Sequence, residues 1–158
     1  MRHFQLLLIF LISVSVFSCA KDQNTNPSLT EEEKLKVEAT LKVEAIKSTE
    51  WVINGFTTVD NTPIDPALFS GDAKFIDQLT YIFDNTGIVR SYDKISKQAQ
   101  AYGTWGLIEN STKLEINIQG FKGTFAVIEL SKLKMILRNN IKYKNLEIPV
   151  NMVFIPLK

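Results

Sequence analysis

The only thiol of the chain, on Cys19, is the group most clearly placed for chemistry. Before it stand a basic start at Arg2, an almost wholly apolar run over 4–17 and a small residue, Ser18. This order is typical of a secretory signal peptide, and the apolar run is shorter than the roughly 20 residues of a membrane-spanning helix. We therefore predict a signal peptide over residues 1–18, with Cys19 at the cut.

Val16, Phe17, Ser18 and Cys19 resemble the lipobox of bacterial lipoproteins. The resemblance implies that Cys19 becomes the mature N-terminus and carries a diacylglycerol and a further acyl chain such as palmitate. A single acyl chain gives only marginal membrane binding, so several chains on one residue would anchor the protein stably. Ala20 resembles the residue that follows the cysteine in lipoproteins sent to the outer membrane. At that membrane the protein could face either the periplasm or the outside of the cell. The alternative is a plain secretory cleavage near Ser18 with an incidental cysteine.

The composition excludes several classes of function. The chain has 18 basic and 17 acidic residues, a balance that argues against a nucleic-acid partner. Its one histidine is His3, inside the predicted signal peptide, so the remainder lacks the residues of a histidine triad or of a zinc or copper site. Acid–base catalysis by a pair of carboxylates stays formally possible, but no feature of the sequence marks such a pair. We predict no enzyme, no cofactor and no metal.

Residues 19–29 are polar and predict a flexible tether. Thr30 and Glu33 have the spacing of a capping box, which begins a helix. The near repeat LKVEAT and LKVEAI over 35–46 alternates with a period of two, as a strand does, so capping and periodicity disagree. We favour a helix over 30–47. It could be a stalk or a partner-binding helix, or it could pack against the following domain or space it from the membrane.

The sequence pattern of residues 48–158 predicts one all-β domain, because short runs rich in β-forming residues alternate with turn residues. The turns include Asp84 to Gly87, Glu109 to Ser111, and Gly120. Short connections favour antiparallel neighbours in a barrel or a sandwich, and the one long connection is 59–77. The candidate strands are 49–58, 78–84, 87–94, 100–108, 113–119, 122–130, 132–138 and 148–156.

The order of motifs resembles the small lipocalin-like lipoproteins of Gram-negative bacteria. It consists of Trp51, then TYIFDNTG over 80–87, then YGTWGL over 102–107, followed by the strand at 114–116. The resemblance implies an eight-stranded antiparallel up-and-down (lipocalin-like) barrel, closed at one end and entered beneath the connection 59–77.

A barrel of eight strands can be filled by side chains or can hold one small ligand. Two functions follow. One is a lipid-anchored cell-envelope protein that binds a small apolar or amphipathic ligand inside the barrel. The other is an envelope interaction or structural protein with a filled barrel that acts through its outer surface. The large residues expected to point inward, as ligand wall or as core, are Phe83, Tyr92, Trp105, Ile116, Phe125, Met135 and Phe154.

Three further patterns have ordinary explanations. A basic stripe (Lys132, Lys134, Arg138, Lys142 and Lys144) could meet phosphate groups but is typical of a solvated strand face. The four aspartates of the long connection (Asp60, Asp65, Asp72 and Asp77) could offer oxygens to calcium, yet their spacing matches no known ligand loop. The sequon over 110–112 is expected to be a chance match.

Overall fold

The computed structural model describes residues 29–144 and 146–158. The predicted signal peptide, Cys19 and nearly all of the predicted tether lie outside the described residues. Among the described residues, no helix combines the length and the apolar character that crossing a bilayer requires.

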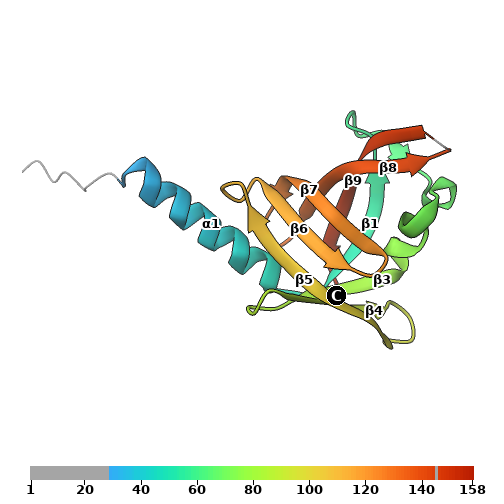
Figure 1. Ribbon diagram of the computed structural model, residues 1–158, viewed down its shortest axis with the longest axis horizontal. Helices are drawn as coiled ribbons and strands as arrows, with labels where there is room; N and C mark the ends of the chain where they lie inside the picture. Colours follow the sequence, from blue (N-terminus) through green and yellow to red (C-terminus); the bar gives the residue numbers. More distant parts are fainter. Residues whose placement is uncertain (1–28, 145) are drawn as a thin grey trace, which may run out of the picture.

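Helix α1 (Glu31–Lys47) confirms the prediction made from the capping signal. The Thr30 hydroxyl accepts the Glu33 N–H at 3.2 Å, and the Glu33 carboxylate accepts the Thr30 N–H at 2.8 Å. These bonds satisfy backbone donors that a helix start leaves unpaired. Only Ala45 and Ile46, in the last turn, are buried, so most of α1 projects away from the rest of the molecule (Figure 1).

Eight strands close into one antiparallel up-and-down barrel, as predicted. Each barrel strand pairs with the next along the chain, and β9 returns to pair with β1, so the barrel has no open edge. A ninth strand of two residues, β2, pairs only with β1. The strands are β1 (Trp51–Thr57), β2 (Pro63–Ile64), β3 (Leu79–Phe83), β4 (Ile88–Asp93), β5 (Ala99–Ile108), β6 (Lys113–Ile118), β7 (Phe121–Leu130), β8 (Met135–Tyr143) and β9 (Leu146–Pro156).

One predicted strand, 132–138, is shifted in the structure. Ser131 to Lys134 form a tight turn, in which the Ser131 N–H donates to the Lys134 carbonyl at 2.8 Å. Strand β8 then continues through Asn139 and Asn140, which have low strand propensity, because the ladder with β9 runs from Met135 to Tyr143. Long-range pairing therefore overrides the local preference.

The long connection between β1 and β3 is ordered and covers the barrel end opposite α1 (Figure 1). It contains β2 and two 3₁₀ helices, η1 (Pro66–Leu68) and η2 (Gly71–Gln78). Phe69 packs edge-on against Phe56 with ring centroids 4.7 Å apart, and Ile76 is buried in the core. We call this end of the barrel the mouth, since the resemblance places the entrance there.

Tyr81 ties η2 to the barrel, because its hydroxyl donates to the Ile76 carbonyl at 3.1 Å. Burial, with a smaller effect of the Asp77 carboxylate, raises the pKa of Tyr81 far above its ordinary value, so this phenol stays a neutral donor. We expect Tyr81→Phe to lower the free energy of unfolding by about 1 kcal/mol, because the buried carbonyl loses its partner. Amide hydrogen exchange should accelerate over 71–78 more than in β6; equal acceleration everywhere would contradict this local role.

Candidate functional site

The interior of the barrel is filled by side chains. Phe83, Ile116, Phe125, Met135 and Phe154 belong to one buried core cluster, each at most 3% exposed. Aromatic rings pack against one another at tilted angles in the core, with the Phe121 ring centroid 4.7 Å from that of Phe125 and 5.2 Å from that of Tyr81. Five of the seven residues predicted to point inward therefore meet in the core.

Trp105 joins this cluster from its rim. It is partly buried against the core, and its ring lies edge-on to Phe83 with centroids 5.5 Å apart. Its indole N–H donates to the Asp84 carbonyl at 3.1 Å.

Tyr92 is the exception among the seven residues. Its neighbours in β4, Val89 and Ser91, alternate into the barrel at 0% and 1% exposure, so Tyr92 points to the outer face. There it borders a groove with Thr80 and Leu157. The inward orientation expected for Tyr92 is corrected by the phase of β4, which the sequence of this strand leaves ambiguous.

A pocket of about 180 Å³ opens at the mouth, between η2 and the adjoining ends of β7 and β8. Its apolar wall includes Ile76, Phe121, Phe125 and Met152, and its polar rim consists of Lys122, Asn139, Asn140 and Lys142.

Sequence reasoning missed most of this pocket. Of the residues predicted to form a ligand wall, the pocket contains only Phe125. The one local signal was the polar residue Asn139, which takes an inward position of β8 between Leu137 and Ile141.

The basic stripe is broken up in the structure. Lys132 and Lys134 lie in the turn before β8, and Lys134 pairs with Glu129 at 2.8 Å. The Arg138 side chain donates to Asn151 at 2.7 Å. The stripe is therefore not one continuous basic face, which weakens the phosphate hypothesis.

The long connection provides no assembled cation site in the part of the chain that the structure describes, where no group of three or more His, Cys, Asp or Glu side chains comes together. Asp65 caps η1 by accepting the Ala67 N–H at 2.9 Å. That aspartate has a structural role.

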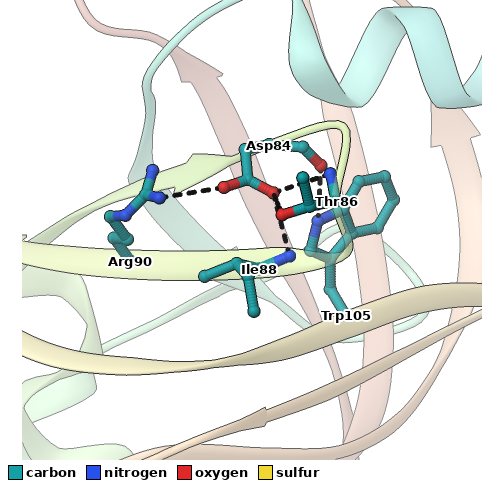
Figure 2. Close-up of polar contacts among 5 residues, drawn as sticks. All are labelled: Asp84, Thr86, Ile88, Arg90 and Trp105. Carbon is teal, nitrogen blue, oxygen red and sulfur yellow. Dashed lines mark hydrogen bonds and ion pairs between the residues drawn. The ribbon is translucent and has the colours of Figure 1, made fainter.

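The hairpin turn between β3 and β4 is organised by Asp84 (Figure 2). One carboxylate oxygen accepts the N–H of Thr86 at 2.9 Å, the hydroxyl of Thr86 at 2.6 Å and the N–H of Ile88 at 3.0 Å. The other oxygen pairs with Arg90 at 3.0 Å. The Asp84 carbonyl holds the Trp105 indole, so this turn links the outer face to the core.

These contacts predict acid sensitivity at one identified carboxylate. The bond from the Thr86 hydroxyl, supported by the Ile88 and Thr86 N–H groups and the Arg90 charge, holds the pKa of Asp84 below its usual 3.8 although partial burial opposes this. The unfolded state then binds more protons, so the contribution is complete above the ordinary pKa and is lost as pH falls through the folded-state pKa. We expect the free energy of unfolding of Asp84→Asn to fall less steeply than that of the wild type below about pH 5.

The measurement is urea denaturation between pH 2 and 6. Asp60→Asn is the control, because no hydrogen bond or ion pair of the described residues involves the Asp60 side chain. Asp93, whose pKa is lowered chiefly by the Ser96 N–H and hydroxyl, stays intact in both variants and contributes equally. Identical acid slopes for Asp84→Asn and Asp60→Asn would contradict the assignment.

No protein-family model matches the chain, and no curated protein matches it.

Proposed function

We propose that this chain is a lipid-anchored cell-envelope protein whose filled barrel acts through its outer surface as an interaction or structural module. The observation that supports the proposal is the filled interior, in which Phe83, Met135 and Phe154 occupy the centre where a carrier protein would hold its ligand. Ligand pockets have volumes of roughly 300–1,000 Å³. The mouth pocket, at about 180 Å³, is smaller than that, and the larger hollows, of about 440 and 490 Å³, lie on α1 and on the outer face beside Tyr92.

The projecting part of α1 is the first surface to test for a partner. Leu35, Val37 and Leu41 are exposed at 48%, 48% and 64%, although side chains of this type are usually buried. The helix is attached to the barrel only near its end, where Lys42 donates to the Ser111 carbonyl at 3.1 Å. A helix held in this way presents its free sides to the surroundings.

The interaction hypothesis predicts that substitutions on α1 alter an association without altering the fold. Chemical crosslinking in intact cells should yield an adduct that is lost in Val37→Glu/Leu41→Glu and retained in Ile95→Glu. Ile95 is the matched control because it is 93% exposed but lies at the β4–β5 turn. An unchanged pattern for both variants would contradict a role of α1.

The filled interior and the anchor have separate tests. Native mass spectrometry of the full chain, purified gently from its own host, should give no mass beyond the polypeptide and its lipid, apart from ligands small enough for the mouth pocket. A bound molecule of fatty-acid length would contradict the filled-barrel proposal. Cys19→Ala should abolish labelling with radioactive palmitate and release the protein from the membrane fraction, and persistent labelling would contradict lipidation of Cys19.

A second candidate function is the binding of a small amphipathic ligand at the mouth. The observation that favours it is the position of the pocket, which lies beneath η2 and combines an apolar wall with a polar rim. Convergent polar groups over an apolar wall are typical of ligand sites.

A further inference from the structure

The rim of the mouth pocket is rich in hydrogen-bond donors and has positive charge. Lys122 and Lys142 line it, and no aspartate or glutamate is among its lining residues. The ion pairs of the described residues engage neither lysine. A cleft lined by one sign of charge concentrates counter-ions, so the rim favours an anionic group.

Asn139 adds a donor whose orientation is fixed. Its side-chain carbonyl accepts the Asn140 N–H at 2.8 Å, so the carbonyl is occupied and the amide nitrogen is left to donate. Across the β7–β8 pair, Gly123 makes room for that nitrogen, because a Cβ at position 123 would lie 3.0 Å from it. Among the described residues, no hydrogen bond uses the amide nitrogen of Asn139. The rim therefore combines the Asn139 amide donor with two exposed lysines, Lys122 and Lys142, whose long side chains start from the outer face of β7 and β8.

The wall of the pocket restricts what else the anion can carry. Ile76, Phe121 and Met152 are buried apolar side chains that line this space. A fully hydrated inorganic ion would remove no apolar surface from water there, so it would gain no hydrophobic stabilisation. A volume of about 180 Å³ also excludes a long acyl chain. The occupant must pair one anionic group with a short apolar body.

We propose that the mouth pocket binds a small organic carboxylate, with its carboxylate at Lys122, Lys142 and Asn139 and its short apolar body against Ile76, Phe121 and Met152. The inference rests on the second proposed function, and it specifies the charge and the size of that ligand.

The experiment is isothermal titration calorimetry on the full chain in phosphatidylcholine nanodiscs. Four probes separate charge from size: benzoate, its neutral counterpart benzamide, inorganic phosphate, and decanoate. We expect benzoate to bind at least tenfold more tightly than each of the others. We also expect its affinity to fall with rising salt, because charge attraction at a solvent-accessible rim is screened.

Variants test the location. Lys122→Gln/Lys142→Gln should weaken benzoate binding at least tenfold, while Lys36→Gln/Lys94→Gln, which removes the same charge outside the pocket, should change it less than twofold. Asn139→Leu should weaken benzoate more than benzamide. Retained folding of each variant is checked by circular dichroism.

The alternative outcomes are distinct. Equal binding of benzamide would overturn the anionic assignment while the mouth pocket remained a ligand site. Equal binding of phosphate would overturn the apolar body, and tighter binding of decanoate would overturn the size limit. No binding of any probe would overturn both the inference and the second proposed function, without bearing on the surface role of the filled barrel.

Discussion

Gly103→Ala is expected to destabilise the barrel by roughly 3 kcal/mol or more, since overpacking against backbone cannot be relieved by a rotamer change. Gly103 lies in β5 where the end of β6 crosses close to it. An added Cβ would collide with the Asn117 carbonyl and would lie 2.7 Å from the Ile118 Cα. Both contacts are with main chain, so β5 and β6 would have to separate.

Gly106→Ala is the matched control, because it lies three residues further along β5 and an added Cβ there meets nothing within 4 Å. We expect Gly106→Ala to be neutral or slightly stabilising, since alanine lowers the entropy of the unfolded chain. Urea denaturation followed by tryptophan fluorescence compares the two. Equal stability of both alanine variants would mean that the close approach of β5 and β6 does not exist in solution.

Much of the fold could be predicted because local signals agreed with it. The clean alternation of Leu114, Ile116 and Ile118 predicts a half-buried strand, and all three are buried in β6. The Asp84 to Gly87 turn could be predicted for a related reason. Its aspartate binds nearby backbone N–H groups, and its glycine adopts a φ of 81°, so its chemistry lies within a few residues.

The features that could not be predicted depend on distant strands. The extent of β8 is set by its ladder with β9, and the phase of Tyr92 is set by which side of β4 meets the core. The mouth pocket combines η2 with β7, β8 and β9, so no local pattern could assemble Lys122 with Asn139. Alternation separates the two faces of a strand but does not tell which face is inside. In β4 the larger residues, Ile88 and Tyr92, lie on the outer face, while Val89 and Ser91 point inward.

The second large effect is expected at Trp51, which closes the barrel end that adjoins α1. Its side chain is fully buried, and its indole N–H donates to the Ile46 carbonyl at 2.7 Å. That carbonyl belongs to the last turn of α1, where carbonyls lack partners within the helix. One residue therefore fills the barrel end and completes the helix end.

Trp51→Ala is expected to lower the free energy of unfolding by about 3–5 kcal/mol, because it leaves a large cavity and an unpaired buried carbonyl. Trp51→Phe keeps most of the packing and should cost about 1–3 kcal/mol, mainly through the lost hydrogen bond. Trp105→Phe provides the comparison. It removes the same kind of indole-to-carbonyl bond at a site that is only partly buried, where water can replace the donor.

The two phenylalanine variants distinguish a closing role from ordinary core packing. If the bond to Ile46 holds α1 on the barrel, Trp51→Phe should increase amide exchange over 42–48 more than in β6, whereas Trp105→Phe should leave 42–48 unchanged. A uniform increase along the chain in Trp51→Phe would mean that Trp51 contributes only bulk to the core. The orientation of α1 depends on the buried hydrogen bond from Trp51, on the hydrogen bond from Lys42 to the Ser111 carbonyl and on the buried Ile46 side chain. The surface that the proposed function uses depends on the same contacts.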